Sequence, residues 1–228
     1  MGKPLILIFF LTLPSLLGAQ TVLEGDFSLS KDFTYYLKEG EDFPLPPPPE
    51  CYLTDNQQNL YRTLLEDVRF LYSLMLYGAR FVYIPGDTRD QVEDRFEWEL
   101  MGEIAWGDPG LSVTDLWFEG NEMYIHVRYK LSPTQSARLE AWESPVFPVS
   151  GGWGEYSNYK ENARQEAVRM AVRQSVRNYW QPREYERPRE ISGQVFLREF
   201  PRFGVGQGNE RAFVMTRFRF DDIVKYPR

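Results

Sequence analysis

The sequence has 228 residues, a formal net charge of −7 and an aromatic content of 16%. This length is sufficient for one domain with a substantial core, and the acidic balance argues against a protein that binds nucleic acid. There is one histidine and one cysteine, so the sequence excludes a Cys/His zinc site and an internal disulfide. We expect neither a metal nor a cofactor.

The first 19 residues have the form of a signal peptide. Lys3 precedes a mainly apolar run over residues 5–17, and small residues before Gln20 offer a cleavage site after Ala19. The run is shorter than the ~20 apolar residues that a membrane-spanning helix needs, although an uncleaved anchor is the alternative. We therefore predict export to the periplasm or the extracellular space, with no transmembrane segment after cleavage.

Residues 20–53 read as an extended, poorly structured segment. Four consecutive prolines over residues 46–49 favour a stiff polyproline II spacer, and docking of a partner is the alternative interpretation. Cys51 is either a small buried residue or a reactive thiol, and the sequence leaves both open.

Residues 54–228 form a single predicted domain that begins with two helices and a strand. A capping box of Thr54 and Gln57 opens a helix to about residue 77, and residues 81–84 read as a short strand. A similar pattern at Thr88 and Gln91 predicts a second helix to about residue 104. Its inner face would hold Val92, Phe96, Leu100 and Ile104, and its outer face an acidic stripe of Asp90, Glu93, Asp94 and Glu97. This acidic segment lacks the ligand spacing of an EF-hand, so we interpret it as a solvated face.

The clearest local pattern is a β-hairpin over residues 112–131. Gly120-Asn121 is a two-residue turn, and it fixes the register so that Asp115 lies opposite His126. These two residues form a possible polar pair, because the carboxylate could orient or charge-stabilise the imidazole ring. No nucleophile for a histidine-dependent mechanism can be identified, so surface pairing is the simpler interpretation.

Residues 142–159 are rich in glycine and aromatic residues. If they form a mobile loop, Trp153 and Tyr156 are candidates to stack on sugars of a cell-wall glycan. The alternative is that these rings fold back as a lid on the core, which burial of aromatic side chains favours.

A long helix is predicted over about residues 161–180, ended by Pro182. Small and β-branched residues form one stripe, in which alanine would allow close packing on a sheet. Arg169, Arg173 and Arg177 form a second stripe at i, i+4 and i+8. These arginines either pair with the acidic stripe of residues 90–97 or form the binding site for an anionic polymer or an acidic partner.

Two further strands, near residues 195–200 and 212–220, complete the pattern, with a glycine-rich loop between them. The expected fold is α+β: an antiparallel sheet built from two hairpins and a short strand, with about three helices on one face. The predicted function is a non-enzymatic binding or assembly protein of the cell envelope, whose partner is another envelope protein or cell-wall glycan. The alternative is a carboxylate-dependent glycan hydrolase, which would need two acids facing one cleft.

Overall fold

The computed structural model describes residues 22–30, 46, 48, 53–87, 91–158, 160, 162–181 and 188–226. These residues form three helices: α1 (Asp55–Leu76), α2 (Pro133–Trp142) and α3 (Ala163–Trp180). The strands are β1 (Val22–Ser30), β2 (Ala79–Ile84), β3 (Arg95–Leu100), β4 (Leu111–Glu119), β5 (Glu122–Lys130), β6 (Val149–Ser157), β7 (Pro188–Leu197), β8 (Arg202–Gly206) and β9 (Asn209–Lys225). The predicted signal peptide, Cys51, Asp90 and Pro182 lie outside the described residues.

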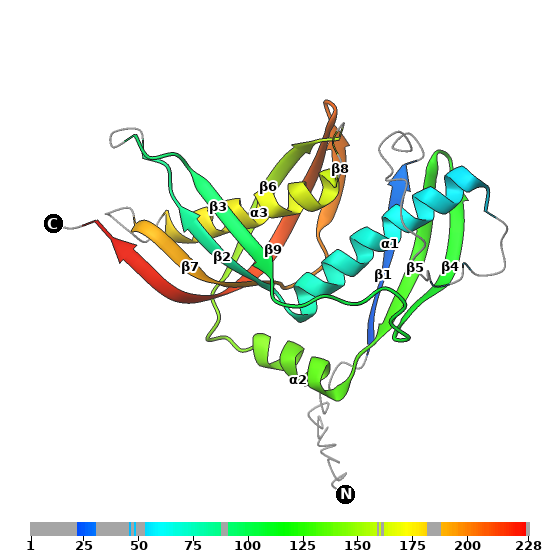
Figure 1. Ribbon diagram of the computed structural model, residues 1–228, viewed down its shortest axis with the longest axis horizontal. Helices are drawn as coiled ribbons and strands as arrows, with labels where there is room; N and C mark the ends of the chain where they lie inside the picture. The colour runs from blue at the N-terminus through cyan, green and yellow to red at the C-terminus, as the bar shows by residue number, and fades with distance from the viewer. Residues whose placement is uncertain are drawn as a thin grey trace, which may run out of the picture.

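The fold is α+β with antiparallel strands, as predicted, but the strands divide between two sheets. The smaller sheet has the order β1-β5-β4, and the larger has the order β3-β2-β7-β9-β6 with β8 paired to β9. Figure 1 shows α3 lying across the larger sheet, α1 beside the smaller sheet, and α2 below them. The helices do not share one face of one sheet, because α2 reaches the face of the larger sheet that α3 leaves open.

The packing of α3 on β6 depends on small residues on both sides. A Cβ atom added to Gly152 would lie 2.2 Å from the carbonyl oxygen of Ala171, and one added to Gly154 would lie 2.1 Å from that of Ala167. Only glycine therefore allows the helix backbone to approach the strand this closely. The alanine stripe predicted to face a sheet does so, and Ala167, Ala171 and Val172 are fully buried.

Aromatic side chains join the two sheets into one continuous core. The ring of Tyr72 on α1 lies 5.8 Å from that of Phe27 on β1, and the Tyr72 hydroxyl donates to the carbonyl oxygen of Val127 on β5 at 3.0 Å. Phe200, in the β7–β8 connection, lies 5.4 Å from Phe27 and 5.5 Å from Tyr72. One hydrophobic cluster therefore includes residues of both sheets.

The boundaries of α1 follow from its local sequence. The Gln57 side chain accepts a hydrogen bond from the Thr54 backbone N–H at 2.9 Å, which confirms the predicted capping box. After the helix, Gly78 has a φ of +73°, and its N–H and that of Tyr77 both donate to the Ser73 carbonyl oxygen. Glycine at this position allows the chain to turn directly into β2.

The Tyr61 hydroxyl on α1 also donates to the carbonyl oxygen of Pro46, at 2.8 Å.

The prediction of a helix over residues 88–104 was wrong, because residues 95–100 form β3. Phe96 lies beside Tyr83 and Trp98 beside Phe81 on β2, while Glu97 and Glu99 are exposed on the other face. This strict alternation is the strand period of two. Spacing of four residues, as between Phe96 and Leu100, is compatible with the strand period of two and with the helix period of about 3.6.

Residues 149–157, interpreted from the sequence as either a mobile loop or a lid folded on the core, form β6. The glycines that suggested a loop are the positions at which α3 approaches the strand. Residues 22–30, predicted to be poorly structured, form β1, which pairs with β5 about 100 residues away. Helix α2 was not predicted.

The hairpin of β4 and β5 has the predicted register near its turn, with Phe118 opposite Met123 and Asp115 opposite His126. A bulge after Val113 shifts the register, so that Val127 pairs with Val113 rather than Thr114. At the C-terminus, β7 pairs with β9 as expected, and the Gly204-to-Gly206 segment lies in β8 rather than in a loop.

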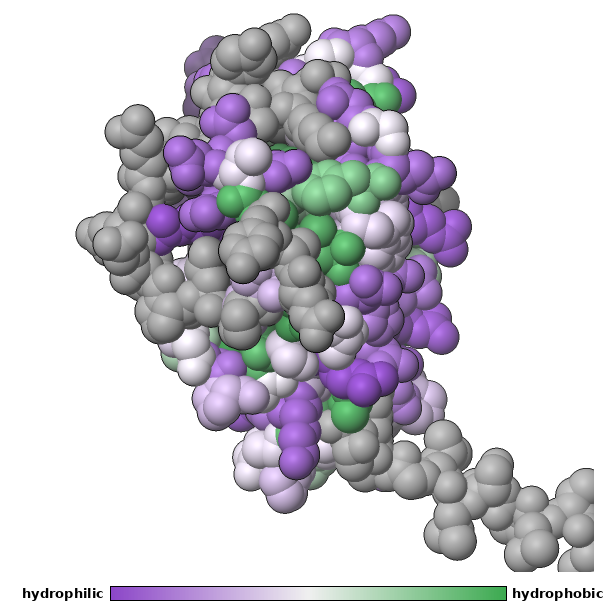
Figure 2. Space-filling view, turned by 90° about the vertical axis from the view of Figure 1, so that its right-hand side faces the viewer, coloured by the Kyte–Doolittle hydropathy of each residue, from purple (hydrophilic) through white to green (hydrophobic). Residues whose placement is uncertain are grey.

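No helix in the described part of the chain is long and apolar enough to cross a membrane. Figure 2 views the molecule from the side of the smaller sheet, and this side is mostly hydrophilic with small hydrophobic areas.

Candidate functional site

The open face of the larger sheet carries a row of polar side chains on three adjacent strands. Arg80 on β2 lies opposite Gln194 on β7, and Gln194 lies opposite Arg219 on β9. Neighbouring positions on these strands, such as Ala79 and Val195, are buried on the face that α3 covers. Because side chains alternate along a strand, the three polar residues share the other face.

Helix α2 forms a roof over one end of this open face. Ser132 and Gln135 form a reciprocal capping box at its start, and Pro133 is its first residue. At the other end, the ring of Trp142 lies 3.5 Å from that of Phe196 on β7 and 4.3 Å from that of Phe147. The helix is therefore attached to the protein at both ends.

The attachment at the first turn of α2 uses a second set of contacts. The Gln135 side-chain amide donates to the hydroxyl oxygens of Tyr77 at 2.8 Å and Tyr129 at 3.0 Å. Tyr129 in turn donates to Asp108 at 3.1 Å. This hydrogen-bonded chain links α2 to the end of α1 and to β5, so the distance between the roof and the sheet is fixed by polar contacts as well as by ring stacking.

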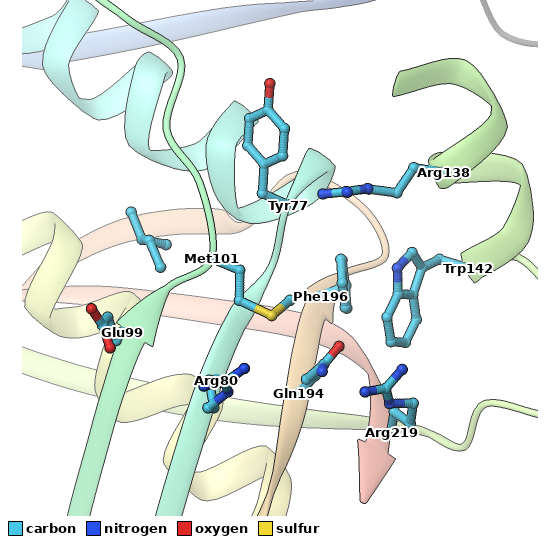
Figure 3. A pocket seen from close by; sticks show the side chains of 10 residues that line it. Tyr77, Arg80, Glu99, Met101, Arg138, Trp142, Gln194, Phe196 and Arg219 are labelled. Carbon is cyan, nitrogen blue, oxygen red and sulfur yellow. The ribbon is translucent and has the colours of Figure 1, made fainter. Parts of the chain in front are cut away.

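A pocket of about 550 Å³ lies between α2 and the open face. This volume is within the range of ordinary small-molecule sites. Figure 3 shows Arg80, Gln194 and Arg219 on the sheet and Arg138 and Trp142 reaching toward the same space from α2. The lining residues are Tyr77, Arg80, Glu99, Leu100, Met101, Arg138, Trp142, Gln194, Phe196 and Arg219.

The pocket is positively charged, because it contains three arginines and one carboxylate, that of Glu99. Within the described part of the chain, no carboxylate lies within 4 Å of the guanidinium group of Arg80 or Arg138. The Arg138 guanidinium lies 5.5 Å from the centre of the Tyr77 ring, and Arg219 has an exposed ion pair with Asp221 at 3.3 Å. Glu99 lies opposite Arg80 in the sheet, so three arginines face one carboxylate, and the net positive charge favours an anionic ligand.

A second cavity, of about 430 Å³, shares Trp142 and Phe196 with the first. Its lining includes three glutamates, Glu24, Glu143 and Glu199, together with two arginines and apolar side chains such as Leu23 and Leu139. It lacks the excess of positive charge that distinguishes the pocket under α2.

The predicted arginine stripe lies on α3, and the structure pairs two of its members inside the protein. Arg169 donates to Glu166 at 2.7 Å and to the Phe96 carbonyl oxygen at 3.2 Å. Arg173 has an ion pair with Asp94 at 3.4 Å. Of these contacts, only that of Arg173 is with the predicted acidic stripe, whose Asp94 lies in the β2–β3 connection rather than on a helix. Arg177 is exposed.

The structure separates the two predicted glycan-binding aromatics. Trp153 on β6 is 62% exposed on the open face, with its ring 4.9 Å from that of Phe213. Tyr156 is partly buried against the hydrophobic core. They therefore do not form one stacking surface, and neither lines the pocket under α2.

The predicted Asp115–His126 pair is adjacent in register, but the side chains have other partners. His126 Nδ1 lies 2.6 Å from the carboxylate of Asp26 on β1, on the opposite side of β5. The Asp115 carboxylate accepts from the Leu116 backbone N–H at 2.9 Å. Sequence reasoning missed Asp26 because it lies in a segment predicted to be unstructured.

A buried ionic cluster, formed by Arg164, Asp67 and Glu210, lies where the two sheets meet. Arg164 on α3 has an ion pair with Glu210 on β9 at 3.0 Å and with Asp67 on α1 at 3.7 Å, and it donates to the Ser28 carbonyl oxygen on β1 at 2.8 Å. Each of the three charged side chains is no more than 13% exposed.

Burial raises the pKa of Asp67 to about 6, and Arg164 and the hydrogen bond from Gln165 offset only part of this effect. All the charges of this cluster have partners inside the fold. We therefore interpret the cluster as structural.

Among the described residues, no group of three or more His, Cys, Asp and Glu side chains is arranged to hold a metal ion. The sequence also did not single out Arg80, Arg138 or Gln194. They come from segments 56 to 114 residues apart, and each reads locally as an ordinary exposed residue. Only the pairing of β2, β7 and β9 and the position of α2 bring them together.

Comparison with known proteins adds one finding. A family model for a domain of unknown function matches residues 20–226. Neither the curated proteins nor the solved structures produced a match.

Proposed function

The chain belongs to that family of domains of unknown function, and we propose that it is an exported, non-enzymatic binding protein of the cell envelope that binds an anionic ligand under α2. The observation that carries the proposal is the pair of arginines, Arg80 and Arg138, that face one pocket without a carboxylate partner in the described structure. The ligand would supply the missing negative charge.

Export is supported by the sequence of residues 1–19, with Lys3 followed by an apolar run and small residues before Gln20. A fusion of residues 1–25 to a periplasmic reporter tests this part of the proposal separately. Reporter activity outside the cytoplasm, together with a mature N-terminus near Gln20, is the expected result. Retention of Met1 on exported protein would contradict cleavage.

The hydrolase alternative does not fit the pocket under α2, and would instead require the second cavity, where Glu24, Glu143 and Glu199 line one space. Glycosidases that use two carboxyl groups need both on opposite sides of the scissile bond. The pocket under α2 contains one carboxylate, that of Glu99, and its other charged residues are arginines. Binding of an anion is the chemistry that this lining fits.

Anion binding tests the proposal directly. We expect inorganic phosphate to shift the indole N–H resonance of Trp142 in a saturable way at low salt, because Trp142 lines the pocket. The double variant Arg80→Gln/Arg138→Gln should weaken this binding at least roughly fivefold. Arg202→Gln is the matched control, because Arg202 is exposed on the same sheet but outside the pocket.

An unchanged affinity in the double variant, with the fold intact by circular dichroism, would contradict the proposal. Equal weakening by Arg202→Gln would show that phosphate responds to the net charge of the protein rather than to this pocket.

A further inference from the structure

We infer that the ligand of this pocket carries two separate anionic groups, one bound at Arg80 and the other at Arg219. This inference rests on the proposed function and specifies the chemistry of the ligand: a dicarboxylate, a diphosphate or a molecule with one group of each kind. It depends on the spacing of the arginines and on the side chain between them.

Arg80 and Arg219 lie on the sheet side of the pocket, and we call them the floor arginines. In the arrangement that the structure shows, they are too far apart to bind one small anion together. Arg80 and Arg219 are separated by the whole of strand β7. Adjacent strands lie about 5 Å apart, which places the two Cα atoms roughly 10 Å apart. Figure 3 shows their guanidinium groups on either side of Gln194 rather than converging over it.

A bidentate arginine contact requires both anion oxygens within about 3 Å of one guanidinium group. In the arrangement that the structure shows, a single carboxylate or phosphate contacts one of the two floor arginines, which leaves the other for a second anionic group.

Gln194 fits the middle of such a ligand. Its side chain is half-buried, and within the described residues its amide group has no hydrogen-bond partner. The amide offers both donors and an acceptor, so it suits a polar, uncharged linker between two anionic ends. A third arginine at this position would instead favour a single extended negative charge.

Helix α2 adds a third cation and an aromatic ring to the pocket. Figure 3 shows Trp142 between Arg138, which lies beside Tyr77, and Arg219 on the sheet. The contacts of Gln135 with Tyr77 and of Trp142 with Phe196 hold α2 in place. The separation between the cations is thus set by the fold before a ligand binds, which lowers the entropy cost of binding and makes the pocket selective for length.

Paired probes test the inference, with one and two anionic groups of otherwise similar chemistry. Acetate is compared with glutarate, and phosphate with a bisphosphate whose two groups are joined by a three-carbon linker, by calorimetry and by the Trp142 indole N–H resonance at constant ionic strength. The two-group probes should bind roughly tenfold more tightly or better, because the second contact becomes intramolecular.

Single variants then show whether both floor arginines are used. In Arg80→Gln and in Arg219→Gln, glutarate should bind no more tightly than acetate, whereas Arg202→Gln should keep the preference. A short acidic peptide with two glutamates serves as a further probe, and tighter binding of the peptide than of glutarate would identify a protein partner as the source of the two carboxylates.

The outcomes separate this inference from the proposed function. If acetate and phosphate bind through Arg80 and Arg138 but the two-group probes gain no more than the statistical factor of two, the inference is overturned and the proposed function stands. If no anion binds to the wild-type protein, both are overturned.

Discussion

The two faces of the larger sheet differ in how closely they are packed and in whether their arginines have carboxylate partners. On the face that α3 covers, Gly152 and Gly154 allow the backbones of α3 and β6 to touch, and the buried Arg164 of α3 has carboxylate and carbonyl partners on three other elements. On the open face, Arg80 faces a cavity with no carboxylate within 4 Å in the described structure.

This difference distinguishes two reasons for an arginine to be present. Buried charges are tolerated only when they are paired, so the partners of Arg164 are required by the fold itself. An exposed arginine has no such requirement, and we propose that Arg80, beside a cavity, pairs with a ligand instead. Substitutions on the covered face should therefore change stability, and substitutions on the open face should change binding.

The largest effect is expected from Arg164→Met. The substitution leaves the buried carboxyl groups of Asp67 and Glu210 without a counter-charge, and removal of one partner from a buried ion pair typically costs about 3–5 kcal/mol. Urea-induced unfolding measures the change. The matched open-face substitution Arg80→Met should change the free energy of unfolding by no more than about 0.5 kcal/mol. Similar losses for both variants would contradict the comparison.

The raised pKa of Asp67, on the covered side of the sheet, should be visible in the pH dependence of the free energy of unfolding. Burial raises its pKa from 3.8 to about 6, so between these values the folded state binds more protons than the unfolded state. The free energy of unfolding should therefore rise as pH falls through this window, by about 1.4 kcal/mol per pH unit from this group alone. Above pH 6 the charged carboxylate destabilises the fold.

The contribution of Asp67 is isolated by comparing the wild-type protein with Asp67→Asn. The difference between their unfolding free energies should change with pH between about 4 and 6, because only the wild-type protein titrates at this position. Glu97→Gln, at an exposed carboxylate, is the control. Its free energy of unfolding should keep the rise of the wild-type protein as pH falls from about 6 to 4. Parallel curves for the wild-type protein and Asp67→Asn would refute the assignment.

Gly154→Ala tests the close approach of α3 to β6. The new Cβ atom would lie 2.1 Å from the Ala167 carbonyl oxygen, so the helix must shift, at a cost of about 1–3 kcal/mol. Gly204→Ala is the matched control, because a Cβ atom there meets nothing within 4 Å. Thermal unfolding should show a clear loss for the first variant and little change for the second. Equal melting temperatures would mean that the contact is not as close as the structure describes.

Sequence reasoning succeeded where the deciding interactions are local. The capping box at Thr54 and the turn at Gly120-Asn121 each lie within a few residues of the structure they determine. The small-residue stripe of α3 was informative because helix periodicity places Ala167 and Ala171 on one face. The prediction failed at β3 because the spacing of Phe96 and Leu100 fits helix and strand equally, and only Trp98, on the same face between them, shows the strand period.

Long-range pairing explains most of what could not be predicted. Strand β1 is stable only through β5, and the glycines of β6 read as a loop until α3 is placed against them. The residues of the pocket under α2 are likewise brought together only by long-range pairing. Arg80, Gln194 and Arg219 become neighbours only when β2, β7 and β9 pair, so no local pattern could distinguish them from other exposed polar residues.

The smallest effect is expected from Trp153→Ser, which compares the two faces within one strand. Trp153 and Tyr156 lie on β6, but Trp153 is 62% exposed on the open face, while Tyr156 packs against the core. Truncation of Trp153 loses mainly its ring contact with Phe213, so the free energy of unfolding should fall by no more than about 0.5 kcal/mol. Tyr156→Ser should cost about 1–3 kcal/mol, because it removes apolar surface from the core. Urea-induced unfolding of both variants measures the contrast. A loss above about 1 kcal/mol for Trp153→Ser would show that this ring supports the fold, and would remove it as a candidate for contact with a partner.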